Sequence, residues 1–229
     1  MPVKIQYQDL GLMDYQFAWD YQVSLFDERV NRKLLNRTLP EDQRIYPDNY
    51  LLFVEHPHVY TLGKSGNQNN LLINDEFLKK IGATYYHIDR GGDITYHGPG
   101  QIVGYPIFDL EQMGMHIKQY VNTLEESIIQ TLKHFGISAG RLNGATGVWL
   151  DAGTPRARTI CAIGVKASRF ITMHGFAFNV NTDLNYFSYI NPCGFHDKGV
   201  TSLQNELGSK QDIDQVKLIL RDNLIRLFT

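Results

Sequence analysis

A glycine-rich segment at residues 90–101, RGGDITYHGPGQ, combines residue types that could hold a ligand. Its four glycines permit close backbone approach and backbone angles that other residues resist. Arg90, Thr95, Tyr96 and His97 add hydrogen-bond donors and an aromatic wall. The segment is not a Walker loop, because no Gly-Lys-Ser/Thr sequence follows. Composition alone slightly favours a structural hairpin whose polar residues satisfy one another.

A second candidate is Cys193, in the sequence NPCG at residues 191–194. Pro192 and Gly194 are turn formers, so they predict that Cys193 lies at a loop tip. An isolated cysteine is more often a buried structural residue, and Cys161 in the apolar run TICAIGV fits that interpretation. Cys193 fits it poorly. A thiol that carries an acyl group must be exposed to its donor and partly ionised.

The third candidate segment, residues 158–181, contains two β-type runs that frame His174. Small residues at 162–164 and 175–177 would leave room for an extended acyl chain beside the backbone. The alternative is simply a hairpin of two core strands. The histidines contain no metal-type cluster except His56 and His58, which lack further ligands nearby, so the sequence predicts no metal site.

These segments need a scaffold of helices and strands. Hydrophobic periodicity predicts helices over residues 15–35, 115–135 and from 212 to the C-terminus, where Asp212 and Gln215 form a capping-box pattern. Strands are expected within residues 50–62, broken by Pro57, and at 102–109, 147–150, 159–165 and 173–180. A few long helices among strands predict an α/β fold, an α+β sandwich with helices packed on a sheet. No repeat or linker is visible, so residues 1–229 are expected to form one domain.

The periodicity also predicts which side of each helix is buried. The expected stripe of the first helix is Ala18, Tyr21, Leu25, Val30 and Leu34. For the second helix it is Val121, Leu124, Ile128, Leu132 and Phe135, followed by Gly136 as a C-terminal stop. For the third it is Ile213, Val216, Leu220, Leu224 and Leu227.

Composition excludes several classes of protein. A formal net charge of −2 gives no reason to expect nucleic acid or an anionic membrane as a partner. No apolar run reaches the roughly 18 residues that span a bilayer. No signal-peptide core is visible, so the two cysteines are interpreted as free thiols in a reducing compartment, and we expect a cytoplasmic protein.

In this order, the segments RGGDITYHGPGQ, AIGVKASR, MHGFAFNV and NPCG resemble the lipoyl(octanoyl) transferases of the biotin/lipoate protein ligase superfamily. The stretch YTLGKS at residues 60–65 is also similar to that family. The resemblance implies a biotin/lipoate protein ligase-like catalytic domain. It implies transfer of octanoate from octanoyl-acyl carrier protein to lipoyl-domain lysines, without a cofactor of its own. The acceptors would be E2 subunits of 2-oxoacid dehydrogenases and the glycine cleavage H protein.

The resemblance also assigns roles to residues. It maps the acyl-thioester cysteine of the family onto Cys193. The substrate contacts that it implies come from the glycine segment and from the two small-residue segments. They are Arg90, Gly91, Gly92, Asp93, Ile94, Thr95, Tyr96 and His97, with Ala162, Ile163, Gly164, Gly175, Phe176 and Ala177.

One position departs from the family pattern. A lysine usually stands five residues before the glycine of the AIG segment and forms a dyad with the cysteine, lowering the pKa of its thiol. Here that position is Thr159, which cannot supply a positive charge. Lys166 is an improbable replacement, because strand residues seven apart point to opposite faces unless a bulge intervenes. His97 is the better candidate base, and the missing group predicts slow transfer.

Two other functions stay open at this point. An ATP-dependent lipoate or biotin ligase would share the fold and would need no nucleophilic cysteine. A non-catalytic binder of acyl carrier protein or lipoyl domains is the second alternative, and Thr159 is the feature that favours it.

Overall fold

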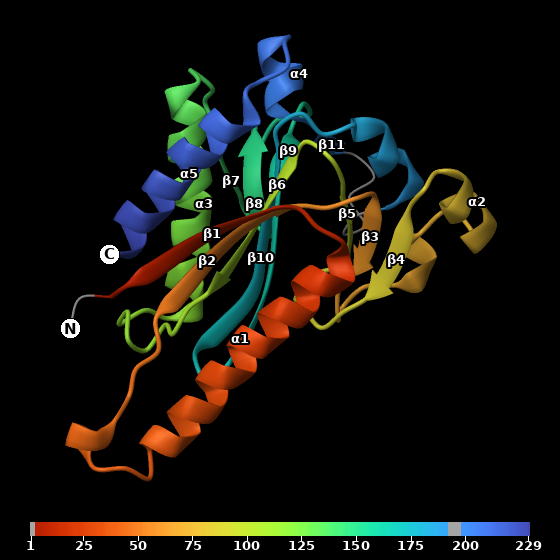
Figure 1. Ribbon diagram of the computed structural model, residues 1–229. Helices are drawn as coiled ribbons and strands as arrows, with labels where there is room; N and C mark the ends of the chain where they lie inside the picture. Colours follow the sequence, from red (N-terminus) through yellow and green to blue (C-terminus); the bar gives the residue numbers. More distant parts are fainter. Residues whose placement is uncertain (1–2, 192–197) are drawn as a thin grey trace.

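The computed structural model describes residues 3–191 and 198–229, and within them the chain forms a large mixed sheet (Figure 1). Its eight strands run in the order β1-β2-β6-β10-β9-β8-β7, and β11 pairs with β9. β1 is parallel to β2 and β11 to β9, whereas the remaining neighbours are antiparallel. The strands are β1 (Ile5–Leu12), β2 (Asn49–Glu55), β6 (Gln101–Ile107), β7 (Gly140–Leu142), β8 (Ala145–Leu150), β9 (Arg158–Ser168), β10 (Ile171–Asn179) and β11 (Gly199–Val200).

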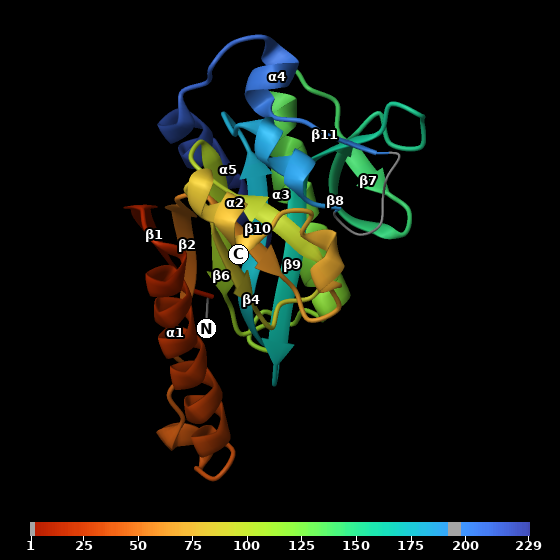
Figure 2. The same cartoon turned by 90° about the vertical axis from the view of Figure 1, so that its right-hand side faces the viewer.

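Helices cover both faces of this sheet, as Figures 1 and 2 show. α3 (Ile117–His134) and α5 (Ile213–Phe228) lie together on one face, and α1 (Tyr15–Asn36) crosses the other. Alternation along β10 supplies both sides, since Phe176 and Phe178 belong to the α3/α5 core while Ala177 belongs to the α1 core. The expected sandwich of helices on a sheet is therefore confirmed.

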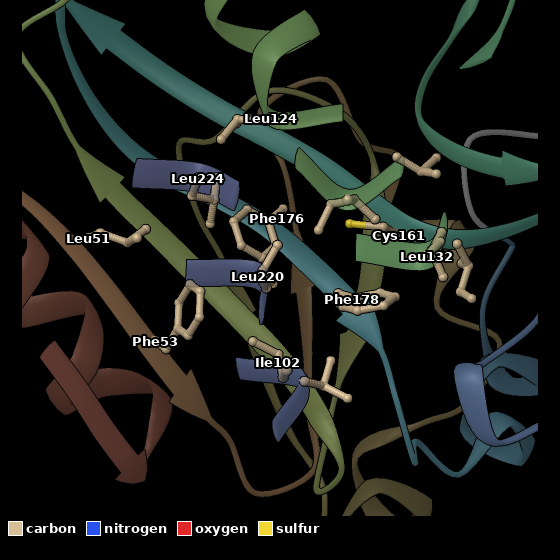
Figure 3. Close-up of a cluster of buried hydrophobic side chains, with 14 of the residues drawn as sticks. Leu51, Phe53, Ile102, Leu124, Leu132, Cys161, Phe176, Phe178, Leu220 and Leu224 are labelled. Carbon is tan, nitrogen blue, oxygen red and sulfur yellow. The ribbon is translucent and has the colours of Figure 1, made fainter. Parts of the chain in front are cut away.

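The larger core lies between the sheet and the helices α3 and α5 (Figure 3). Leu124 and Leu132 of α3 and Leu220 and Leu224 of α5 are each at most 1% exposed. Full burial of one such side chain contributes about 1.5–3 kcal/mol. The Cys161 sulfur lies among these apolar side chains, so the structural interpretation of this cysteine is confirmed.

The predicted long helices are confirmed with boundaries shifted by only a few residues. The Asp212 carboxylate caps α5 by accepting from the backbone N–H groups of Asp214 and Gln215. Gly136 follows α3 with a φ of 74°, as a helix stop should. In α1, however, the stripe is partly wrong, because Leu34 is 39% exposed and Gln22 and Arg29 are buried instead.

A smaller sheet of three strands stands beside the large one, at the right of Figure 1. Its order is β4 (Thr84–His87), β3 (Val59–Leu62) and β5 (Ile94–His97). The short helices α2 (Asp75–Lys80) and α4 (Leu203–Leu207) and the 3₁₀ turns η1 (Glu41–Gln43), η2 (Gln68–Asn70) and η3 (Leu184–Tyr189) complete the described elements. The glycine segment is thus not one continuous loop, because its centre forms β5.

The strand expectations are otherwise confirmed. The run over residues 50–62 gives β2 and β3 on either side of Pro57, and the other four runs give β6, β8, β9 and β10. β1 was not predicted, although Ile5 and Tyr7 alternate with Gln6 and Gln8 along it. Within the described part of the chain, no helix is both long and apolar enough to cross a membrane.

Candidate active site

A cavity of about 500 Å³ opens where the glycine segment lies against β9 and β10. This volume falls within the range of ordinary small-molecule sites. Most of the residues singled out in the sequence line it. They are Arg90, Gly91, Gly92, Asp93, Ile94, Thr95, His97, Thr159, Ala162, Ile163, Gly164, Gly175, Phe176 and Ala177. The topology therefore brings the two small-residue strand segments and the glycine segment to one place.

The first glycines of the segment are fixed against β9 by backbone contacts. The Gly91 N–H donates to Val165 O at 2.9 Å. A Cβ atom added at Gly164 would lie 2.8 Å from Gly91 O, and one at Gly63 would overlap with Gly92 O. The Arg90 guanidinium donates to Thr61 O at 2.6 Å, which ties the segment to β3 as well. Glycine is required at Gly63 and Gly164 because two backbones approach too closely there for any side chain.

Gly164→Ala is expected to lower the free energy of unfolding by about 1–3 kcal/mol, since the added methyl group overpacks the contact with Gly91. Gly140→Ala is the matched control, because a Cβ there would meet no atom within 4 Å. Urea denaturation of both variants measures the difference. Equal stability of the two would show that the glycine segment does not depend on this close approach.

Of the expected substrate contacts, all of which lie within the described residues, Tyr96 is the one that does not line the cavity. Its side chain is fully buried in the core of the small sheet. The hydroxyl group lies 2.7 Å from His58 Nδ1, and the ring stacks on Tyr186 with centroids 5.0 Å apart. The side chain thus packs against η3, and its substrate contact stays a prediction.

His97 lies in the cavity wall with both ring nitrogens engaged. Gln101 Nε2 donates to Tyr96 O and Asn179 Oδ1, so Gln101 Oε1 is the acceptor that faces His97 Nδ1 at 2.9 Å. Nδ1 therefore carries the hydrogen, and Nε2 accepts from the Thr61 hydroxyl group at 3.3 Å. Burial, followed by the neighbouring His56, lowers the pKa of His97 to about 3. The role of His97 as base stays a prediction, and it requires Thr61 to give up its bond.

A second histidine, His174 of β10, also lines the cavity. Its Nε2 atom lies 2.9 Å from Asp89 Oδ1, and Asp89 Oδ2 lies 2.6 Å from the Lys166 ammonium group. The hydrogen bond from His174, helped by Lys166, holds the pKa of the Asp89 carboxyl group well below its usual range. Lys166 also packs over the ring of Phe26, so its ammonium group is directed to the α1 side of the sheet.

Thr159 lines the cavity on β9, beside the strand that returns from the NPCG segment. Val200 of β11 is its register partner, and Thr201 N–H donates to Thr159 O at 2.9 Å. The Thr159 hydroxyl group is 3.4 Å from Val148 O, a contact at the limit of hydrogen bonding. Thr159, at the position where the resemblance implies a lysine, therefore presents an uncharged side chain to the cavity.

Cys193 lies outside the described residues, which end at Asn191 and resume at Lys198. On the near side of that segment Phe187 lines the cavity, and on the far side Lys198 and Gly199 do. The other cysteine, Cys161, is buried, and burial raises the pKa of its thiol well above the usual value.

Sequence reasoning missed several cavity residues. Tyr15 and Tyr105 contribute aromatic walls, and Lys198 contributes a cation. Tyr15 stacks on His97 with an interplanar angle of 10°. The position of Lys198, five residues after Cys193, could have marked it as a candidate site residue. No sequence pattern, however, related it to Thr159. Among residues 3–191 and 198–229, no group of three or more His, Cys, Asp or Glu side chains could hold a metal ion.

Together, the helix-covered mixed sheet and the small sheet define an α/β domain with a cavity at the junction of the two sheets. The model of the lipoyl protein ligase A/B catalytic domain family matches residues 14–225. The chain therefore belongs to this family, and the resemblance expected from its motifs is confirmed.

Similar proteins agree with this assignment. The chain is 58% identical over 229 residues to an octanoyltransferase of Flavobacterium johnsoniae, covering 100% of this chain and 98% of that protein. It is 56% identical over 222 residues to an octanoyltransferase of Cytophaga hutchinsonii, covering 96% and 91%.

Among solved structures, a bipartite lipoate protein ligase from Thermoplasma acidophilum aligns with a TM-score of 0.69 at 18% identity, covering 99% of this chain and 84% of that one. A lipoate-protein ligase A bound with ATP aligns with a TM-score of 0.64 at 18% identity, covering 99% and 85%. These two structures share the fold with this chain.

Proposed function

We propose that this chain transfers an octanoyl group from octanoyl-acyl carrier protein, through a thioester on Cys193, to a lysine of a lipoyl domain. Relatives that are 54–58% identical over nearly the whole chain are named octanoyltransferases, which supports octanoyl transfer as the activity. One structural observation carries the cysteine step. The described residues on both sides of the Cys193 segment, Phe187 and Lys198, line the same cavity as the glycine segment.

The first step forms the acyl-enzyme. The Cys193 sulfur attacks the donor thioester, a new C–S bond forms, and the phosphopantetheine thiol leaves with a proton. The cavity suits the acyl chain, because Ala162, Gly164, Gly175 and Ala177 keep side chains out of the space beside β9 and β10. With Thr159 in the lysine position, ionisation of the Cys193 thiol lacks its usual support, so this step is slow.

In the second step, a lysine amine attacks the thioester and leaves octanoylated. The proposed acceptors are lipoyl domains of 2-oxoacid dehydrogenase E2 subunits and of the glycine cleavage H protein. The proposal treats residues 1–229 as one catalytic domain that acts in the cytoplasm and needs no cofactor.

The intact mass of the protein, before and after incubation with octanoyl-acyl carrier protein, tests the thioester step. We expect one added octanoyl group, its loss in Cys193→Ala, and its retention in the matched control Cys161→Ala, whose cysteine lies in the core. An adduct that survives in Cys193→Ala contradicts the proposal. ATP-dependent modification of a lipoyl domain by free octanoate would favour a ligase instead.

A further inference from the structure

A second cavity lies at the far end of α1, away from the candidate active site. Its volume is about 520 Å³, again within the range of small-molecule sites. α1 begins beside the small sheet, where Tyr15 lines the first cavity, and ends at the lower left of Figure 1. Arg29 is the first α1 residue of the second cavity, and at 1.5 Å per residue it lies about 20 Å along the helix from Tyr15. The two linings share no residue, so the cavities are separate.

Cations dominate the lining of this second cavity. They come from the C-terminal part of α1 and from the loop that leads to β2. The five are Arg29, Arg32, Lys33, Arg37 and Arg44, against two carboxylates, Asp109 and Glu111. The helix dipole accounts for Lys33 in the last turn of α1, but not for Arg29 or Arg44. Because the whole chain has a formal net charge of −2, this cluster is a local concentration of positive charge, which attracts anions.

The two carboxylates of the lining are already neutralised by Lys33. Its Nζ atom lies 2.7 Å from Asp109 Oδ1 and 2.8 Å from Glu111 Oε2. Among residues 3–191 and 198–229, the side chains of Arg32, Arg37 and Arg44 form no ion pair. Their one hydrogen bond to a described residue runs from Arg44 Nε to Leu39 O at 3.1 Å. Three guanidinium groups are thus left to bind an anion.

Arg29 is the buried and fixed member of the set. Its side chain is 3% exposed. Nη1 donates to Leu25 O at 2.7 Å, Nε donates to Asp48 O at 3.0 Å, and the guanidinium group lies over the Tyr50 ring. The carboxylate at 3.4 Å, that of Glu28, is 62% exposed. Because a buried charge costs free energy unless it is well paired, an anion in the cavity would offset a cost that these neutral partners leave.

We propose that this cavity is a binding site for a small anion with two or more phosphate groups. The inference goes beyond the proposed function and uses no group of the first cavity. Arginine suits this ligand, because its planar guanidinium group donates two parallel hydrogen bonds to phosphate oxygens. A single phosphate cannot face Arg32, Arg37 and Arg44 with a charge for each, whereas a short polyphosphate chain can.

Two sources of such phosphates are distinguished through Tyr46, which lines the cavity and is 52% exposed. Its ring offers a face on which the base of a nucleoside polyphosphate can stack. If the ligand is a nucleotide, Tyr46→Ala should weaken ATP binding about 5–100-fold and leave tripolyphosphate binding unchanged. Equal affinities of both probes, with and without Tyr46, would identify inorganic polyphosphate instead.

Isothermal titration calorimetry of the intact chain with tripolyphosphate, ATP and citrate, at low ionic strength and without divalent cations, tests the site. We expect one tripolyphosphate per chain. Arg32→Gln and Arg37→Gln should each weaken its binding about 10–100-fold, as the loss of hydrogen bonds to a charged group predicts. The matched control Arg156→Gln removes the same charge from a side chain that is 82% exposed, outside both cavities, and should change the affinity less than about twofold.

Several results would overturn the inference. They are the absence of binding by tripolyphosphate and ATP, a loss in Arg156→Gln as large as in Arg37→Gln, and citrate binding as tight as that of tripolyphosphate. ATP binding that Arg37→Gln leaves unchanged would place the nucleotide elsewhere, as in a ligase, and would also exclude this site. Urea denaturation of the variants verifies that they fold, which we expect because Arg32 and Arg37 donate no side-chain hydrogen bond to the described residues.

Discussion

Thr159→Lys is expected to accelerate formation of the acyl adduct by about 10²–10⁴-fold at pH 7. An unperturbed thiol with a pKa of about 8.5 is only a few per cent thiolate at that pH, so full ionisation accounts for at most about a 30-fold gain. A larger gain would come from proton delivery to the leaving thiol by the new ammonium group. Thr159 lines the cavity, so a lysine there extends into open space.

The measurement is the rate of mass gain with octanoyl-acyl carrier protein, compared with Thr159→Met as an uncharged control of similar length. Alkylation by iodoacetamide against pH gives the thiol pKa directly, because the other thiol, Cys161, is buried. The midpoint should move down in Thr159→Lys and stay in Thr159→Met. No gain in rate would favour the non-catalytic binder over the enzyme.

The second large effect is a loss of stability in mild acid, of about 3 kcal/mol for each of two histidines between pH 6.5 and 4. Burial lowers the pKa of His56 to about 4 and that of His97 to about 3. The unfolded chain therefore binds more protons in this window. The stability from the neutral rings is present above pH 6.5 and declines as the pH falls toward the folded-state values.

Urea denaturation at pH 7.5, 5.5 and 4.5 measures this slope. His56→Gln should make the pH dependence clearly smaller, whereas the exposed control His134→Asn should leave it unchanged. Asp89 does not affect the stability between pH 7.5 and 4.5. A carboxyl group with a lowered pKa loses its contribution to the free energy of unfolding only below about pH 4. Equal stability at pH 7.5 and 4.5 would contradict the burial of neutral His56 and His97.

The sequence predicted the long helices and the central strands well, because apolar spacing reports directly on which side of an element is buried. It failed where a buried side chain is polar. Gln22 and Arg29 replace the expected Leu34 in the buried stripe of α1, since Gln22 bonds to His174 and Arg29 reaches Asp48 O at 3.0 Å. No periodicity in apolar residues can signal such contacts.

The cavity residues were predictable from their local motifs, but their arrangement was not. Asp89 and His174 are 85 positions apart and meet only because the glycine segment lies on β9. Thr61 likewise belongs to β3, and its hydroxyl group occupies the nitrogen that His97 would need as a base. The alignment of distant strands decides which histidine keeps a ring nitrogen without a hydrogen-bond partner among the described residues. A single sequence does not reveal that alignment.

Gly63 and Gly164 hold the glycine segment against both sheets, because a side chain at either would meet a carbonyl oxygen of Gly91 or Gly92. This wall of the cavity is therefore set by main-chain contacts that few substitutions can alter. The strands β9 and β10 also line the cavity with Ala162 and Ala177, where a larger side chain would shorten the space. During divergence of the family, selection for shorter or longer acyl groups can thus act on one wall while the other is conserved by sterics.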